Sequence, residues 1–114
     1  MKYMLLINTG NGSSEWDQLS EDQQNAVMAE YYAIAESPGV VGGAQLQPTD
    51  TATTVRVQNG QTLTTDGPFP EMKETLGGYY LFEGDDLDAA IELAARIPAA
   101  RFGGSVEVRP LAEM

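Results

Sequence analysis

Two segments of the chain predict β-strands that carry apolar side chains on both faces. Residues 3–7 (YMLLI), within the predicted strand 2–8, are apolar at five successive positions. The predicted strand 78–83 (GYYLFE) also has bulky apolar groups in both of its alternating sets. A strand with two apolar faces is normally buried on both of them. Any fold of this chain must therefore cover both faces of the sheet that holds these strands.

A helix is predicted over residues 20–36. Ser20 and Gln23 have the spacing of a capping box, in which each side chain accepts a hydrogen bond from a backbone N–H at the start of the helix. Pro38 ends this helix, because proline lacks the N–H that continues the hydrogen-bond ladder. The apolar face of the helix is expected to comprise Val27, Met28, Tyr31, Ile34 and Ala35.

A second helix is predicted between the strand 78–83 and Pro98. Asp85 or Asp86 provides the N-cap, since an aspartate oxygen can accept a hydrogen bond from the first free backbone N–H groups. Pro98 is expected to end the helix. Its apolar stripe is expected to comprise Leu87, Ala90, Ile91, Ala94 and Ile97.

The remaining predicted elements are strands. Residues 40–47 (VVGGAQLQ) predict a strand that its two glycines weaken or bulge. Residues 53–58 and 62–65 flank an Asn-Gly pair at 59–60, which is a strong hairpin signal because both central positions of a type I′ turn need a positive φ. Residues 105–109 (SVEVR) alternate in polarity and predict the last strand.

The order of these elements predicts an α+β fold in one domain covering residues 1–114. The order is β-α-β, an inserted hairpin, then β-α-β, which is the ferredoxin-like plan with an antiparallel sheet. Two helices can cover only one face of a four-stranded sheet. The other face must meet an apolar surface, so we expect a homodimer whose sheets pack face to face. The alternative is that the inserted hairpin folds back over its own sheet.

Composition excludes several classes of function. The chain has 17 acidic and 6 basic residues, a formal net charge of −11, and no cysteine or histidine. Zinc sites built on Cys or His, thiol nucleophiles and Ser-His-Asp triads are therefore excluded. The few scattered cations argue against binding to nucleic acids or to anionic membranes. No apolar run is long enough for a membrane span or a signal peptide, so we expect a cytoplasmic protein. We also expect no metal and no cofactor.

Loop 66–74 (DGPFPEMKE) is the strongest candidate for a functional site. Two prolines stiffen the loop by lowering its unfolded-state entropy, and stiff loops that display polar groups often bind or catalyse. Asp66 is the candidate catalytic residue, as a general base or a ligand anchor, and Lys73 is a candidate substrate-binding residue. The alternative role for Asp66 is an Asx-turn, in which the carboxylate caps backbone N–H groups and does nothing else.

Three further side chains are candidates for substrate binding. Trp16 is the single tryptophan and could line a cleft, Arg56 could bind an anion bidentately, and Tyr80 could donate a proton. Each also has a purely structural interpretation. Trp16 could plug the edge of the domain, Arg56 could be a counter-charge among many acids, and Tyr80 could pack in the core.

The block DGPFPEMKETLGGYYLFE resembles the DGPF family of bacterial proteins, within the YCII-related superfamily. The resemblance covers nearly the whole chain, from KYMLLI to GSVEVRPL. It implies a ferredoxin-like chain that pairs into a dimeric α/β barrel. It also implies a catalytic His–Asp pair, of which only Asp66 carries over because the chain has no histidine. Asp66 would then need another partner, such as Lys73, Tyr80 or Arg56.

Two kinds of function follow from these observations. The first is a small-molecule pocket beside loop 66–74, in a binding protein or in a small enzyme that uses Asp66; members of the broader group resemble enzymes acting on ring compounds. The second is a non-enzymatic regulatory or interaction protein whose acidic surface engages a basic partner. The genomic association of this family with extracytoplasmic-function sigma factors implies a link of the second kind to transcription.

Overall fold

The computed structural model describes residues 1–9, 17–47, 49–66 and 76–112. Its elements follow the expected order of β-α-β, inserted hairpin and β-α-β. They are β1 (Lys2–Asn8), α2 (Glu21–Ala35), β2 (Val40–Gln45), the 3₁₀ turn η1 (Thr49–Thr51), β3 (Thr53–Gln58), β4 (Gln61–Asp66), β5 (Leu76–Glu83), α3 (Leu87–Ala95), the 3₁₀ turn η2 (Pro98–Ala100) and β6 (Ser105–Pro110).

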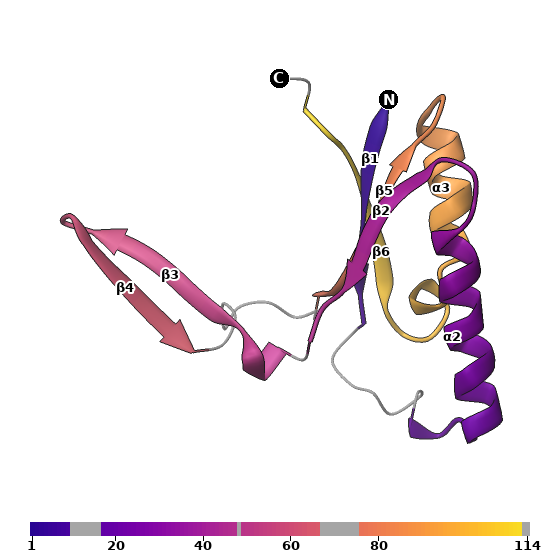
Figure 1. Cartoon of the computed structure of the whole chain (residues 1–114), viewed down its shortest axis with the longest axis horizontal. Coiled ribbons are helices and arrows are strands. Elements are labelled where there is room, and N and C mark those ends of the chain that lie inside the picture. The colour runs from indigo at the N-terminus through magenta and orange to yellow at the C-terminus, as the bar shows by residue number, and fades with distance from the viewer. Residues whose placement is uncertain (10–16, 48, 67–75, 113–114) are drawn as a thin grey trace.

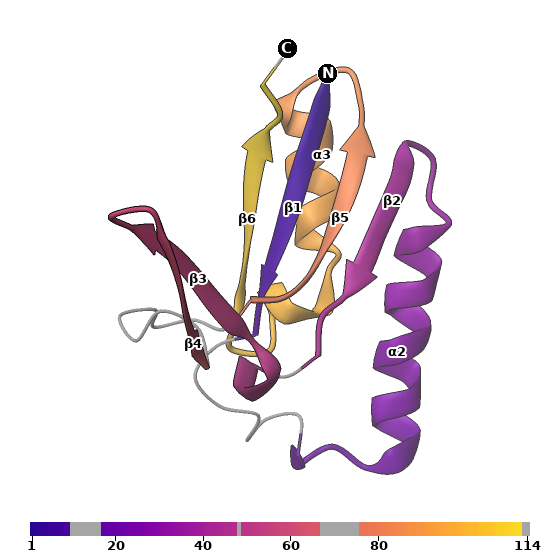
Figure 2. The ribbon, with the colours of Figure 1, turned by 60° about the vertical axis from the view of Figure 1, so that its left-hand side comes forward.

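Four strands form one antiparallel sheet in the order β2-β5-β1-β6 (Figure 1). The two segments with apolar residues on both faces, β1 and β5, are its central strands. Leu5 lies opposite Tyr80 on one side and Val108 on the other, so these three side chains share a face. Both helices cover this face, and the chain has an α+β fold (Figures 1 and 2).

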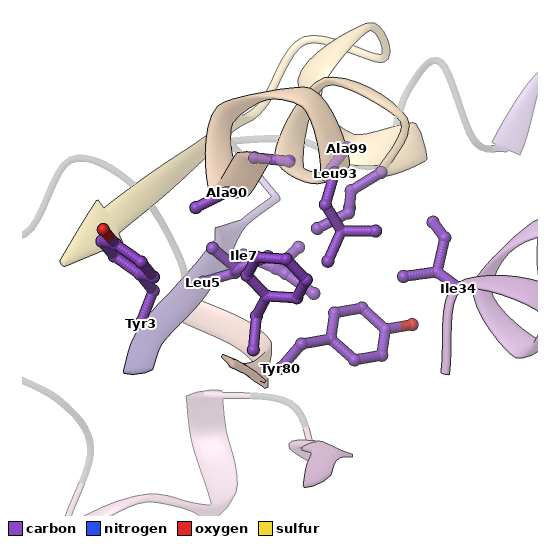
Figure 3. Packing of buried hydrophobic residues seen from close by; sticks show 11 residues of the cluster. Tyr3, Leu5, Ile7, Ile34, Tyr80, Ala90, Leu93 and Ala99 are labelled. Carbon is purple, nitrogen blue, oxygen red and sulfur yellow. The ribbon is translucent and has the colours of Figure 1, made fainter. Parts of the chain in front are cut away.

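The core lies between the sheet and the helices (Figure 3). Tyr3, Leu5 and Ile7 of β1 are buried there, as are Tyr80 and Phe82 of β5. The helical layer contributes Ile34, Ala90, Leu93, Ala94, Ile97 and Ala99. Burying such side chains stabilises the fold by about 1.5–3 kcal/mol for each large one.

The start of α2 confirms the predicted capping box. The Ser20 side chain accepts from the backbone N–H of Gln23 at 3.1 Å, and the Gln23 side chain accepts from the Ser20 N–H at 2.8 Å. Glu21 and Asp22 follow in the first turn, where the positive end of the helix dipole favours negative charge. Val27 and Ile34 are buried as expected, whereas Ala35 is exposed.

The expected apolar stripe of α3 is partly wrong. Leu87 and Ile91 are 47% and 49% exposed, while Ala90, Leu93 and Ala94 face the sheet. The nine residues LDAAIELAA carry apolar side chains around most of the helix circumference. Periodicity therefore does not select the buried face. The small Ala90 and Ala94 bring the helix close to β1, and that approach leaves Leu87 and Ile91 outside.

Strands β3 and β4 form a separate two-stranded sheet that projects away from the main sheet (Figure 1). Asn59 and Gly60 both have positive φ, at 52° and 76°, which confirms the predicted turn. The alternative in which this hairpin folds back over its own sheet is wrong. The second face of the sheet, with Met4, Leu6 and Leu81 at its centre, is not covered by either helix.

Candidate small-molecule pocket

A cavity of about 430 Å³ opens between α2 and the adjoining ends of β2 and β5. Small-molecule sites in proteins usually enclose about 300–1,000 Å³. Four tyrosines contribute to its wall, two from α2 and two from β5, and Met28 and Gln45 lie beside them. The tyrosines are Tyr31, Tyr32, Tyr79 and Tyr80, of which Tyr79 directs its side chain to the opposite face of the sheet. The cavity is therefore large enough for one aromatic ring with substituents.

Two glycines on facing strands shape the floor of this pocket. A Cβ on Gly43 would lie 2.6 Å from the backbone oxygen of Tyr79, and one on Gly78 would lie 2.8 Å from the backbone oxygen of Ala44. Real Cβ atoms do not approach this closely, so a side chain at either position would push β2 away from β5. Gly43, one of the two glycines predicted to weaken the strand at 40–47, thus permits close pairing beside the cavity together with Gly78.

Tyr80 connects the sheet to α2 at the pocket wall. Its hydroxyl donates a hydrogen bond of 2.9 Å to the backbone oxygen of Tyr31. Burial, with a smaller contribution from the neighbouring Tyr31, raises the pKa of Tyr80 to about 12. Figure 3 shows the ring of Tyr80 directed toward Ile34 on the same helix.

Burial also raises the pKa of the Tyr31 hydroxyl above its usual value of about 10. A hydrogen bond from the Ala99 backbone and the positive charge of Arg101 partly oppose this shift, while Glu30 adds to it. Arg101 pairs with Glu30 on the surface of α2. Both phenols are therefore neutral at physiological pH.

The wall of the cavity is uncharged. Among the described residues that line it, none is a carboxylate, a lysine or an arginine. The Tyr80 proton is engaged by the Tyr31 carbonyl, so the Tyr80 oxygen can only accept a further hydrogen bond. These features suit a neutral ring compound with O–H groups. The described part of the wall supplies no general base.

The structure separates the residues that the sequence nominated. Tyr80 lines the cavity, whereas Asp66 ends β4 and Arg56 lies within β3, both with exposed side chains on the projecting hairpin. Neither is among the residues lining the cavity. Trp16, Lys73 and loop residues 67–75 lie outside the described residues.

Sequence reasoning did not connect the two tyrosine pairs at 31–32 and 79–80. It assigned Tyr31 to the apolar face of the helix, and the tertiary structure confirms that Tyr31 packs against the core. The feature of the sequence that could have indicated this site is the occurrence of two adjacent tyrosines in both a predicted helix and a predicted strand. Consecutive residues of a helix point about 100° apart and those of a strand point to opposite faces, so each pair presents phenols in two directions.

Two absences apply to the part of the chain that the structure describes. No group of three or more Asp and Glu side chains there is arranged to hold a metal ion. No described helix combines the length and the apolar character that a membrane crossing requires.

Comparison with known families gives a match over the whole chain. The family defined by the YCII-related domain matches residues 1–114. The chain belongs to the YCII-related family. An uncharacterised protein of Rhizobium meliloti is 38% identical over 114 residues, covering 96% of this YCII-related chain and 90% of that protein.

A solved structure shows a similar fold. It is the 5-chloro-2-hydroxyhydroquinone dehydrochlorinase of Burkholderia phenoliruptrix in complex with 2,5-dihydroxybenzoquinone. The TM-score is 0.52 with 15% sequence identity, and the match covers 100% of this chain and 96% of the other. At this identity the likeness is one of fold.

Proposed function

We propose that this YCII-related chain binds a neutral, hydroxylated aromatic ring in the cavity between α2 and β5. One observation carries the proposal: an uncharged cavity of about 430 Å³ whose wall includes Tyr31, Tyr32 and Tyr80. Tyrosine rings stack on aromatic ligands, and such pairs contribute about 0.5–1.5 kcal/mol beyond the area they bury. The quinone bound to the structurally similar dehydrochlorinase is consistent with a ligand of this class.

Catalysis, in this proposal, depends on Asp66. A carboxylate that is ionised at neutral pH can accept a phenolic proton if it reaches the ligand. Asp66 is separated from β5 by residues 67–75, and Gly77 and Gly78 at the start of β5 line the cavity. The described wall supplies no base, and we therefore assign this role in the proposal to Asp66, the carboxylate that precedes residues 67–75. The chain is then a small enzyme of the DGPF type.

The assembly in this proposal is a homodimer built as a dimeric α/β barrel. The uncovered face of the sheet supports it, because Met4, Leu6 and Leu81 lie there without a helix over them. Packing that face against the same face of a second copy removes apolar area from water in both chains.

A second candidate function is supported by the acidic surface. Described acids such as Glu21, Asp22 and Glu92 are exposed on the helical side of the molecule. In this function the helical side engages a basic protein, in the regulatory role that the sigma-factor association implies. Added salt would then weaken the contact steeply, because screening reduces the attraction between exposed charges.

Ala35 offers a direct test of the pocket. Its side chain lines the cavity from the last turn of α2 but is exposed, so Ala35→Phe should fill the cavity without disturbing the core. Hydroquinone is the probe, with binding followed by calorimetry or NMR line broadening. We expect at least about a tenfold loss of affinity, since a filled cavity cannot hold the ring.

Ala29→Phe is the matched control, because Ala29 is exposed on the same helix and does not line the cavity. It should bind hydroquinone as the wild type does. Equal affinity in the wild type and in Ala35→Phe would contradict the pocket proposal, as would a wild-type protein that binds no hydroquinone at millimolar concentration.

A further inference from the structure

The β3–β4 hairpin and the uncovered sheet face lie on the same side of the molecule. Figure 1 shows both helices on one side of the main sheet and the hairpin on the other, and Figure 2 shows the hairpin clear of the helices. We define the open face as the side chains that share the face of Met4. Its charged and large apolar side chains are Lys2, Met4, Leu6, Tyr79, Leu81, Glu83, Glu107 and Arg109, and Asn8, Ala44 and Ser105 share the same face.

In the part of the chain that the structure describes, the hairpin joins no other sheet. Its strands pair only with each other, all of β4 is exposed, and β3 is exposed at every position but Thr54. Val55 and Val57 share one face of the hairpin and are 58% and 68% exposed. An isolated two-stranded hairpin is only marginally stable in water. Its valine face would therefore gain stability by packing on the apolar surface of another molecule.

The open face has the composition of a protein interface. Aliphatic and aromatic side chains occupy its centre, and charged pairs stand at its margins. Lys2 lies opposite Glu83 at one end, and Arg109 Nε is 3.7 Å from Glu107 Oε2 along β6. These pairs leave the margins neutral.

The distribution of charge supports a second copy of this chain as the partner that binds on this side. The open face and the hairpin together carry three basic and three acidic residues, so they are neutral. They are Lys2, Arg56 and Arg109 against Asp66, Glu83 and Glu107. Among the other residues that the structure describes, ten are acidic and two are basic, so they carry a net charge of −8. Contact between two copies through this neutral side therefore brings together less like charge than contact through the acidic helical side.

We propose that the hairpin is an arm that packs its valine face against a second copy docked on the open face. Each copy would then hold the other with the sheet and with the arm. The inference rests on the homodimer proposed above and adds to it the role of residues 53–66. It also explains why an exposed hairpin carries two valines side by side.

Sedimentation equilibrium of the double variant Val55→Thr/Val57→Thr tests the arm. Threonine is β-branched like valine and keeps the strand propensity of β3 while removing the apolar contact. We expect the dimer dissociation constant to rise about tenfold or more. The hairpin lies outside the core, so the circular dichroism spectrum should be unchanged. A dissociation constant within about twofold of wild type would overturn the arm.

Leu63→Thr is the matched control. Leu63 lies opposite Arg56 in the register and so occupies the other face of the hairpin. Its loss should leave the dissociation constant near that of wild type, and a weakening equal to that of the valine variant would overturn the assignment of the valine face.

Failure of the arm and failure of the proposed function give different results. A dimer that is insensitive to the valine variant overturns the arm and leaves the homodimer standing. A wild-type chain that stays monomeric at about 100 µM overturns both the homodimer and the arm. Neither result alters hydroquinone binding, which the Ala35→Phe variant reports separately.

Discussion

The hydroxyl of Tyr80 donates to the backbone oxygen of Tyr31 at 2.9 Å, joining residues 49 apart in sequence. This hydrogen bond ties a central strand to the helix that forms the opposite wall of the cavity. It also uses the one proton of Tyr80, so the phenol cannot donate to a ligand while the bond persists. The proton-donor role considered for Tyr80 from sequence is therefore incompatible with this arrangement.

Tyr80→Phe should destabilise the protein by about 0.5–1.5 kcal/mol, the net contribution of one hydrogen bond. The ring itself stays buried, which keeps the loss small. Chemical denaturation with urea measures it. A loss of more than about 4 kcal/mol would indicate that the hydroxyl has a larger role than this single bond.

The raised pKa of Tyr80 should make the stability of the protein depend on pH in alkaline solution. The folded protein keeps the phenol protonated up to a pKa of about 12, whereas an unfolded tyrosine loses its proton near 10. Between these values the unfolded state binds fewer protons, so stability falls as pH rises. Wild type should lose stability more steeply than Tyr80→Phe from about pH 10 to pH 12. Parallel curves for the two proteins would contradict the assignment.

Substitutions at two nearby residues of α3 should differ strongly in their effect on stability. Leu93 is buried, so Leu93→Ala should cost about 2–5 kcal/mol. Ile91 is half exposed, so Ile91→Ser should change stability by no more than about 0.5 kcal/mol. Thermal or urea unfolding measures both. The reverse ranking would mean that α3 is rotated toward the stripe expected from sequence.

Asp66→Asn should abolish turnover of a hydroxylated aromatic substrate and leave the melting temperature unchanged. Asparagine keeps the shape of the side chain and removes its ability to accept a proton. Asp66 is exposed and ends β4, so the fold does not depend on its charge. General base catalysis typically accounts for a factor of about 10²–10⁴ in rate. Absorbance of the ring follows the reaction.

Asp50→Asn is the control, since Asp50 is exposed on η1 near the base of the same hairpin. It should turn over substrate at the wild-type rate. If Asp66→Asn instead lowers the melting temperature and nothing else, Asp66 is the turn cap considered as the alternative.

Local signals in the sequence predicted most of the elements correctly. The capping box at Ser20 and the Asn59–Gly60 turn each depend on residues within a few positions of one another, so their outcome needs no tertiary information. The apolar runs of β1 and β5 likewise predicted two strands, and the structure places both at the centre of the sheet.

The candidate site was less predictable. Asp66 and Arg56 stand out in the sequence, yet both lie on the hairpin and away from the lining of the cavity. The cavity is formed by side chains from α2, β2 and β5, which meet only after folding. The spacing of residues within one segment does not predict which distant segments will come into contact.

Hydrophobic pattern, capping residues and turn chemistry thus determined which segments are helices and strands, because these effects act over a few residues. Long-range packing decided the rest. It chose the buried face of α3, joined Tyr80 to Tyr31, opened the cavity beside Gly43 and Gly78, and directed the hairpin to the side away from the helices. Each of these depends on which surfaces come within contact distance, and that is a property of the whole folded chain.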